Sequence, residues 1–232
     1  MKLQPLFLLL LLLLCHCNLF AQENATIIVK AGNTIKESVP TIDLYEYPQF
    51  IKGTVFFKDG NSSGAAMNYN RFLDEMQFIA AKGDSLTLTD EKNIRLINIA
   101  RDTFFYDQGY IKLINSTVNV KLGIKETLRI IDKKKIGGYG MSSSTTAIDS
   151  YSSYNDGMQY YNITVMQDLV LAKKVQYYIG DAYNHFVLAS KKNVINLFPK
   201  QQQAIVRYLK ENTIVFNNKE DLEKLVQFLE HL

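Results

Sequence analysis

The stretch of residues 53–70 most constrains the fold, because it joins two alternating segments through a dense cluster of turn-forming residues. Apolar and polar residues alternate before and after this cluster with the two-residue period of a half-buried strand. The residues at the centre, 59–64, are Asp, Gly, Asn, Ser, Ser and Gly. This pattern predicts a β-hairpin, onto which the following segments add as further strands.

Short β-rich runs follow the hairpin, separated by Gly, Asp and Asn as in an antiparallel meander. The expected strands are 76–80, 86–89, 94–99, 103–106, 110–114, 117–122, 127–131, 169–172, 175–179 and 185–188. We expect a meander of this size to curl into a sandwich or an open barrel. Before the hairpin, residues 26–29 are expected to form an edge strand, and Pro40 and Pro48 predict an extended lead-in.

The last forty or so residues change to a helical period. Ser190 is expected to cap a short helix that Pro199 interrupts, and a second helix ends near Asn212. A third helix is expected to begin at Asn217, with Glu220 three residues later in a capping-box-like start.

One apolar stripe runs along this third helix, formed by Leu222, Leu225, Val226, Leu229 and Leu232. We interpret the stripe as packing on the sheet, and a partner-binding helix is the alternative. The fold class expected is therefore α+β: a mainly antiparallel β-rich body over 22–189, followed by two to three C-terminal helices over 190–232.

The N-terminus has the features of a secretory signal peptide. Lys2 precedes a leucine run over 6–14, and Ala21 offers a small residue at a cleavage position. The run is shorter than the roughly 20 apolar residues of a membrane helix, and no second run follows. We expect residues 1–21 to be removed, which leaves no transmembrane segment. Lipidation at Cys15 or Cys17 is the alternative, although neither follows a small residue.

Both cysteines of the chain lie in this predicted signal peptide. The mature protein would then contain no thiol, which excludes disulfides, cysteine nucleophiles and thiolate metal sites. Loss of Lys2 leaves an excess of two positive charges. This balance is far below that of nucleic-acid-binding proteins, so no nucleic-acid partner is expected.

The hairpin turn resembles a calcium loop only in part. Asp59, Asn61 and Ser63 stand at the first, third and fifth places, and Gly64 stands at the sixth. The twelfth place holds Asn70, where such a loop needs a bidentate Glu. We therefore interpret the turn as an ordinary hairpin loop that binds no metal.

No complete catalytic set is present in the sequence. Only His185 and His231 remain in the mature chain, and no Gly-x-Ser-x-Gly turn accompanies them. Paired-carboxylate chemistry stays open, because such pairing appears only in space. Its candidates are Asp74, Glu75, Asp102 and Asp107. No catalytic, cofactor-binding or metal-binding residue is assigned, and no cofactor is expected.

The segment near 133–156 is the longest weakly patterned stretch, and we expect it to be flexible. It contains the glycine-rich run 137–140, which lacks the Lys-Ser/Thr of a phosphate loop. Tyrosines gather within and after it at Tyr151, Tyr154, Tyr160 and Tyr161. They are interpreted as ordinary strand residues, with a stacking platform for a sugar or peptide as the alternative.

Three short motifs follow one another along the chain: Gly-x-Val-x-Phe-x-x-Gly over 53–60, Ala-x-x-Asn-Tyr-Asn over 65–70, and Phe-Pro-Lys over 198–200. In this order the chain resembles a family of uncharacterised exported proteins common in Bacteroidota. The resemblance covers most of the mature chain. It implies export across the inner membrane and a β-rich body with a helical C-terminus, and it carries over no functional residues.

The leading interpretation is an exported, non-enzymatic binding or structural module, located in the periplasm or outside the cell and, as one option, associated with the outer membrane. An envelope protein or a glycan is the kind of partner expected. The alternative is a carboxylate-dependent envelope hydrolase, which would require two carboxylates within about 10 Å in a concave pocket, with one in apolar surroundings.

Overall fold

The predicted hairpin is present. The computed structural model describes residues 26–136, 142–144 and 164–232, and in it β2 (Ile51–Phe57) pairs antiparallel with β3 (Ser62–Asn70). At the turn, Asp59 Oδ1 accepts a hydrogen bond from Asn61 N at 2.9 Å, and Asp59 Oδ2 accepts one from Asn61 Nδ2 at 2.8 Å. Gly60 adopts a φ of +93°, which favours glycine. The Asp59 side chain thus stabilises the turn itself.

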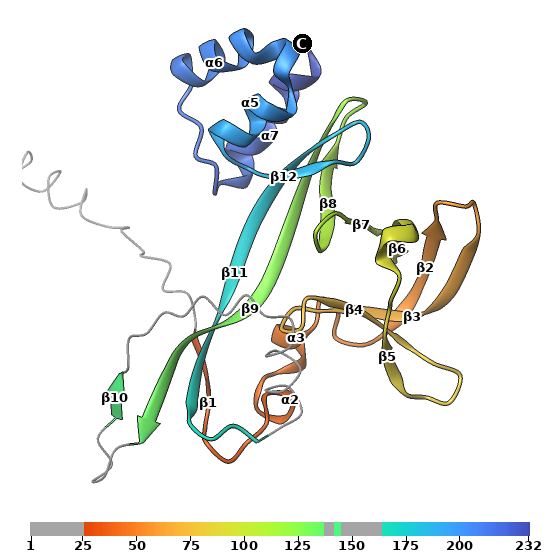
Figure 1. The fold of residues 1–232 in the computed structure, drawn as a ribbon, viewed down its shortest axis with the longest axis vertical. Helices are drawn as coiled ribbons and strands as arrows, with labels where there is room; N and C mark the ends of the chain where they lie inside the picture. Colours follow the sequence, from red (N-terminus) through yellow and green to blue (C-terminus); the bar gives the residue numbers. More distant parts are fainter. Residues whose placement is uncertain (1–25, 137–141, 145–163) are drawn as a thin grey trace, which may run out of the picture.

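Two meanders form most of the sheet, and they meet between β2 and β6 (Figure 1). The first continues from β3 into β4 (Glu75–Ile79) and β5 (Ser85–Thr87). The second contains β6 (Ile94–Ile99), β7 (Asp102–Tyr106), β8 (Tyr110–Ser116) and β9 (Val120–Ile136). After β5 the chain passes through the 3₁₀ turn η1 (Glu91–Asn93) and returns to pair β6 with β2.

Beyond β9 the sheet continues through β11 (Asp168–Asp181) to β1 (Thr26–Val29). The order of the main path is β1-β11-β9-β8-β7-β6-β2-β3-β4-β5, while β10 (Ser142–Ser144) pairs with β9 and β12 (Phe186–Leu188) pairs with β11. These twelve strands, with the helices described below, confirm the predicted α+β fold class with a mainly antiparallel sheet. The edge position of β1 is also confirmed.

The prediction of separate short strands is wrong for β9 and β11, which are continuous strands of 17 and 14 residues. The charged residues that interrupt the apolar pattern remain within the strands because they find ionic partners or solvent. Lys125 Nζ lies 2.6 Å from Asp74 Oδ2, Lys173 Nζ lies 2.7 Å from Asp43 Oδ1, and Lys174 is exposed. Residues 117–119 form the turn before β9 rather than part of a strand.

Several predicted features lie wholly or partly outside the described residues. The signal peptide over 1–21, the glycine-rich run 137–140 and the four clustered tyrosines from Tyr151 to Tyr161 are among them. Of the segment near 133–156, residues 133–136 end β9, and β10 pairs with residues 134–136.

The extended lead-in predicted before the hairpin is wrong, because two short helices form there. These are α2 (Ile35–Ser38) and α3 (Thr41–Leu44). Thr34 Oγ1 accepts a hydrogen bond from Glu37 N at 3.2 Å and so caps α2. Pro40 occupies the N-cap position of α3, where its missing N–H leaves no helical hydrogen bond unmade. Ile35 and Leu44 are buried against β1, β9 and β11.

The C-terminal helices follow the predicted order: α5 (Lys191–Leu197), the 3₁₀ turn η2 (Pro199–Gln201), α6 (Gln202–Glu211) and α7 (Lys219–Glu230). Ser190 caps α5 as predicted. The N-cap of α7 is Asn218 rather than Asn217, since Asn218 Oδ1 accepts a hydrogen bond from Asp221 N at 2.9 Å. Because α7 ends at Glu230, Leu232 lies beyond the helix and is 46 % exposed.

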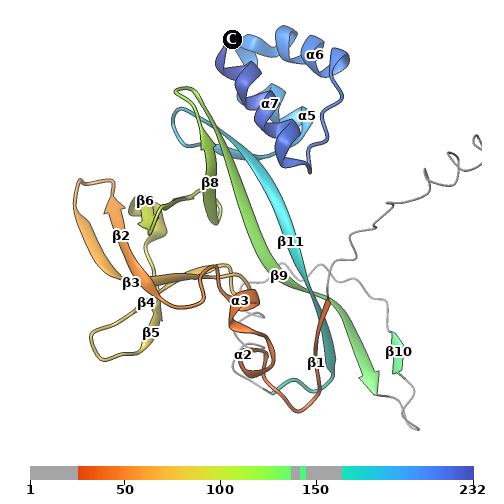
Figure 2. The same ribbon diagram turned by 180° about the vertical axis from the view of Figure 1, so that it is seen from behind.

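The helices cover one end of the long β9–β11 ribbon (Figures 1 and 2). Four of the five residues of the predicted stripe, Leu222, Leu225, Val226 and Leu229, belong to one buried core with Val120 and Leu122 of β9 and with Ile179 of β11. Tyr208 of α6 stacks on Phe228 of α7 with ring centroids 3.9 Å apart. The predicted packing of the third helix on the sheet is therefore confirmed. Among the described helices, none combines the length and apolar character needed to cross a membrane.

Candidate functional site

A group of six ionisable side chains lies where the β3–β4 turn meets β8 and β9. This charged cluster consists of three carboxylates and three cations: Glu46, Asp74, Glu126, Arg71, Lys112 and Lys125. At its edge, the more exposed Arg129 places Nη2 3.5 Å from Asp74 Oδ2. The side chains of Arg71, Glu46 and Lys125 are each less than a tenth exposed. Buried charges are stable when each has an opposite partner, and the cluster meets this condition.

Arg71 is at the centre of one half of the cluster. Its Nη2 lies 2.7 Å from Glu46 Oε2 and 3.2 Å from Glu126 Oε2. Its Nη1 donates to the carbonyls of Ile42, at 2.9 Å, and of Tyr45. One guanidinium thus joins the α3 segment, the β3–β4 turn and β9. Lys112 of β8 forms a further ion pair with Glu46.

Asp74 is at the centre of the other half. Lys125 Nζ lies 2.6 Å from Asp74 Oδ2, and Tyr69 OH donates to Asp74 Oδ1 at 2.7 Å. Burial, followed by the negative charge of Asp74, raises the pKa of Tyr69 well above its ordinary value, so Tyr69 stays a neutral donor. Gly109 adopts a φ of +125°, and a β-carbon there would collide with Lys125 Nζ. The backbone conformation of the β7–β8 turn therefore favours glycine, and a side chain there would displace the end of Lys125.

The space enclosed beside the cluster is too small for a substrate. Glu46, Glu126, Lys112, Lys125 and four apolar or aromatic residues line a cavity of about 10 Å³, which is the room needed by about one water molecule. A general acid of the glycosidase type also needs apolar surroundings that favour its protonated form, whereas Glu46 contacts two cations. The charged cluster therefore has a structural role: its ion pairs connect the segment after α3, the β3–β4 turn, β8 and β9.

Only one of the four predicted carboxylates belongs to the charged cluster, namely Asp74. Glu75 Oε2 accepts from Thr87 Oγ1 at 2.7 Å, and Asp102 Oδ2 accepts from Tyr47 OH at 2.6 Å. Burial, and then the hydrogen bond to Asp102, raises the pKa of Tyr47. Asp107 Oδ2 accepts from Phe186 N at 2.7 Å. Each of these carboxylates thus holds a neighbouring element in place, and the four do not converge on one cavity.

Two asparagines of the hairpin are buried completely, Asn68 and Asn70. Asn68 Nδ2 donates to Tyr47 O at 2.8 Å, and Asn68 Oδ1 accepts from Tyr47 N at 3.1 Å. Asn70 Oδ1 accepts from Phe72 N and from Leu73 N, both at 3.0 Å. Both amides therefore satisfy backbone groups where the chain leaves regular strand pairing.

The histidines are not brought together. His185 is exposed near Asp181, with Nδ1 3.2 Å from Asp181 Oδ2, and His231 is exposed at the end of α7. Within the described residues, no group of three or more His, Cys, Asp and Glu side chains is placed to hold a metal ion.

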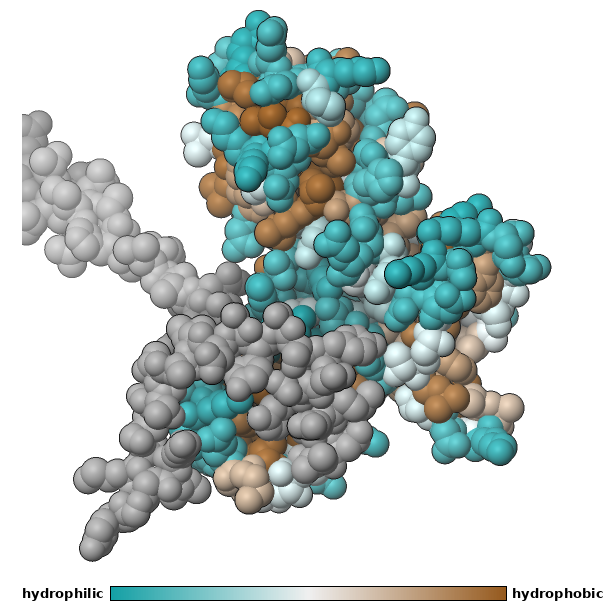
Figure 3. Space-filling view, viewed as in Figure 1, coloured by the Kyte–Doolittle hydropathy of each residue, from teal (hydrophilic) through white to brown (hydrophobic). Residues whose placement is uncertain are grey.

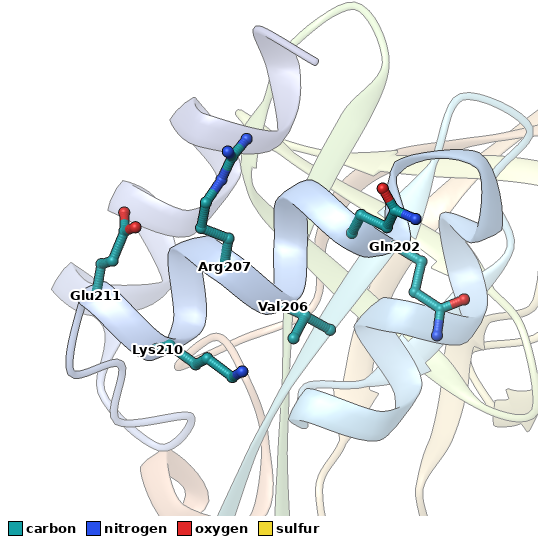
Figure 4. Close-up of a pocket in the computed structure, with 6 residues that line it drawn as sticks. Gln202, Val206, Arg207, Lys210 and Glu211 are labelled. Carbon is teal, nitrogen blue, oxygen red and sulfur yellow. The ribbon is translucent and has the colours of Figure 1, made fainter.

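A shallow surface hollow of about 580 Å³ lies along α6 (Figure 4). Its described lining residues all come from this helix: Gln202, Gln203, Val206, Arg207, Lys210 and Glu211. In Figure 4, Arg207 and Glu211 extend to one side of the helix, and Val206 and Lys210 extend to the other. Because these side chains diverge, they do not form a convergent set of polar groups around a small ligand.

Two neighbouring turns at the helical end of the ribbon present exposed apolar side chains. These hairpin tips, residues 117–119 and 182–185, are adjacent because Val120 pairs with Asp181. Lys121 Nζ donates to the carbonyls of Asp181 and Ala182 at 3.0 and 3.3 Å and so connects β9 to the second tip. Val118 and Tyr183 are each 81 % exposed.

Carboxylates hold the backbone of both hairpin tips. Glu230 Oε2 accepts from Asn119 N at 3.0 Å and from Thr117 Oγ1, and these hydrogen bonds lower the pKa of Glu230. Asp181 Oδ1 accepts from Tyr183 N and from His185 N, both at 2.9 Å. The tips are therefore ordered turns with outward-facing side chains.

Apolar residues also reach the surface over the C-terminal helices, as the brown areas at the top of Figure 3 show. The large exposed apolar side chains in this part of the chain are Leu188, Val215 and Leu232, which are about half exposed. Their exposure is lower than that of Val118 and Tyr183, so the hairpin tips are the most exposed ordered apolar groups of the helical end.

Sequence reasoning did not identify Glu46, Arg71, Lys112 and Glu126 as a group. Glu46 lies between two tyrosines and Arg71 follows the Asn-Tyr-Asn motif, but neither position has a local pattern that predicts an ion pair. The sequence analysis placed Val118 in an expected strand over 117–122, and the exposure of Val118 and Tyr183 depends on the packing of neighbouring elements.

Comparisons with family models, curated proteins and solved structures found no match to this chain.

Proposed function

We propose that the chain is an exported, non-enzymatic binding module of the bacterial cell envelope, which contacts its partner through the hairpin tips. The observation that carries the proposal is the contrast between a fixed backbone and exposed side chains at Val118 and Tyr183. Side chains presented on an ordered backbone lose less conformational freedom on binding than those on a mobile loop.

The chemistry of the tips favours a protein partner. Tyrosine is enriched in protein interfaces because it combines a large apolar ring with a polar hydroxyl. A glycan would stack on the aromatic ring of Tyr183 but would gain little from the aliphatic side chain of Val118. The two tips also project as turns, a shape that fits a groove in another protein.

The rival function, a carboxylate-dependent hydrolase, has one supporting observation: Glu46 and Glu126 contact the same nitrogen of Arg71. Against it stand the compensating cations and the water-sized cavity beside them. A hydrolase would also need a groove that admits the substrate to both carboxylates.

The experiment compares sedimentation of the purified chain with an envelope fraction from the native host. We expect the double variant V118S/Y183S to lose most of the bound fraction, while V215S, which changes an exposed apolar residue elsewhere, binds like the wild type. Protease treatment of the envelope fraction should abolish binding if the partner is a protein. Binding that survives this treatment would assign the tips to a glycan instead.

The same fraction tests the rival. If the wild type releases soluble fragments from the envelope and Glu46→Gln or Glu126→Gln stops this release, the chain is an enzyme and the proposal is wrong. Equal sedimentation of the wild type and V118S/Y183S would also overturn the proposed role of the tips.

A further inference from the structure

The sheet ends at β5, whose outer edge has no strand beside it within the described residues. β5 pairs with β4 on one side and is the last strand of the main path. In Figures 1 and 2, β5 lies at the end of the sheet away from the C-terminal helices. Ser85 and Leu86 are exposed there, Leu86 to 49 %. A further strand therefore has access to this edge.

The hydrogen bonds to β4 show which backbone groups of β5 face outward. Leu88 N donates to Met76 O at 2.8 Å, so the backbone groups of Leu88 face β4. Residues of an antiparallel strand alternate between its two neighbours. Leu86 therefore also faces β4, whereas Ser85 and Thr87 direct their N–H and C=O groups outward, where a further strand would pair with them.

The outer edge of β5 lacks the features that usually keep sheet edges apart. Residues 85–89 are Ser, Leu, Thr, Leu and Thr, without a charge or a proline. Charged side chains, prolines and bulges are the usual protection of an edge strand against pairing with another chain. The edge of β5 is therefore suited to an uncharged strand.

Two copies of β5 fit each other in the antiparallel direction. Hydrogen-bonded pairs join residues that face outward, so Ser85 of one copy pairs with Thr87 of the other, and Thr87 pairs with Ser85. A two-fold axis then passes between the two Leu86 residues. They form a non-hydrogen-bonded pair, in which side chains approach most closely. The exposed leucines thus cover each other.

Charges beside the strand favour this register. Continued past the strand, it sets Lys82 level with Asp90 of the second copy, and both residues are exposed. A register centred on Thr87 would instead set Asp84 level with Asp90. Like charges directly opposite each other destabilise a strand pair. Charge complementarity therefore selects the register centred on Leu86.

We infer that β5 is a self-association surface, through which two copies of the chain pair edge to edge across a two-fold axis at Leu86. The dimer is expected to be weak, because a short edge covers little area and interfaces below about 1,200 Å² belong to transient complexes. The inference does not depend on the hairpin tips, which lie at the helical end of the ribbon and stay free in both copies.

Analytical ultracentrifugation of residues 22–232 measures the association. We expect the wild type to shift from monomer toward dimer as its concentration rises from about 10 µM to about 1 mM. Leu86→Lys should stay monomeric, because it opposes two lysines at the axis. Ile28→Lys is the matched control, since Ile28 is 47 % exposed in β1 at the other end of the main path, and it should dimerise like the wild type. A wild type that is monomeric at every concentration would overturn the inference.

Thr87→Pro tests the backbone pairing separately from the side chains. The N–H that this variant removes faces outward, and an edge strand tolerates proline where its N–H faces solvent. We expect a monomer with the melting temperature of the monomeric Leu86→Lys variant. If Thr87→Pro dimerised like the wild type, the dimer would not be formed by strand pairing at β5.

Single cysteines test the register, since residues 22–232 contain no cysteine. In the inferred register Leu86→Cys lies opposite its own copy, within the Cα separation of about 4.4–6.8 Å that a disulfide needs, so mild oxidation should link the dimer. Ser85→Cys and Thr87→Cys should link only when the two variants are mixed. A faster link from Thr87→Cys alone would contradict the register.

The double variant V118S/Y183S separates this inference from the proposed function. It should dimerise like the wild type, although it is expected to lose binding to the envelope fraction. Loss of the dimer in V118S/Y183S would assign self-association to the hairpin tips and would overturn the inference. A failure of partner binding and a failure of strand pairing can thus be distinguished.

Discussion

Glu46 and Arg71 form an ion pair of 2.7 Å although they are 25 residues apart in the sequence, and both side chains are less than a tenth exposed. The pair connects the segment after α3 to the β3–β4 turn, and Glu126 extends the connection to β9. Removal of one member of a buried ion pair leaves the other charge without compensation, which is more costly than the loss of a surface pair.

Glu46→Ala should therefore lower the free energy of unfolding by about 3–5 kcal/mol. The matched control is Glu223→Ala, which removes a carboxylate 3.6 Å from Lys219 on the exposed face of α7 and should cost less than about 0.5 kcal/mol. Urea denaturation of both variants measures the difference. Similar losses for the two variants would show that the buried pair contributes no more than the surface pair.

Asn70→Ala should destabilise the protein by about 1–3 kcal/mol, because the amides of Phe72 and Leu73 would lose their acceptor in a buried turn. Asn61→Ala is the control, since Asn61 is exposed in the β2–β3 turn, and we expect a change within about 0.5 kcal/mol. Midpoints of urea denaturation report both effects. An unchanged midpoint for Asn70→Ala would mean that water replaces the amide at little cost.

Leu225→Ala should lower stability by about 2–5 kcal/mol, since Leu225 is fully buried in the core that α7 shares with β9 and β11. Leu232→Ala removes the same number of atoms from a partly exposed site and should have little effect. Thermal unfolding followed by circular dichroism compares the two. If Leu225→Ala kept the wild-type melting temperature, the helix would contribute little to the folded body.

Glu230→Gln should make the melting temperature less sensitive to acid. Hydrogen bonds from Thr117 and Asn119 lower the pKa of Glu230 below its ordinary value of 4.5. The unfolded chain therefore binds the proton first, and the stabilisation by ionised Glu230, fully present above pH 4.5, is lost as the pH falls through the lower folded pKa. We expect the wild type to exceed the variant in melting temperature at pH 7 and the difference to shrink toward pH 3. A constant difference would indicate a role other than ionisation.

Local patterns in the sequence predicted the elements that have a clear apolar period, namely the β2–β3 hairpin and helix α7. The hairpin of β2 and β3 follows from alternation on both sides of a turn cluster, and α7 follows from a stripe of leucine and valine at helical spacing. In β2 and α7 the burial of apolar side chains requires the same periodicity that appears in the sequence, whereas β3 is buried on both faces from Met67 to Asn70. The helix cap at Asn218 was missed by one residue, because two adjacent asparagines offer equivalent side chains.

Tertiary structure alone decided how these elements are joined. β6 returns to pair with β2 because backbone groups at a strand edge accept any strand of suitable register, so the sequence of β6 does not specify its neighbour. Lys125 and Glu126 lie within one continuous strand only because Asp74 and Arg71 reach them from the β3–β4 turn. The charged cluster and the hairpin tips depend on contacts between distant segments, whereas periodicity reports only whether a position is apolar. The sequence by itself thus determined the kinds of elements and their faces, and long-range packing determined which charges meet and which apolar side chains remain exposed.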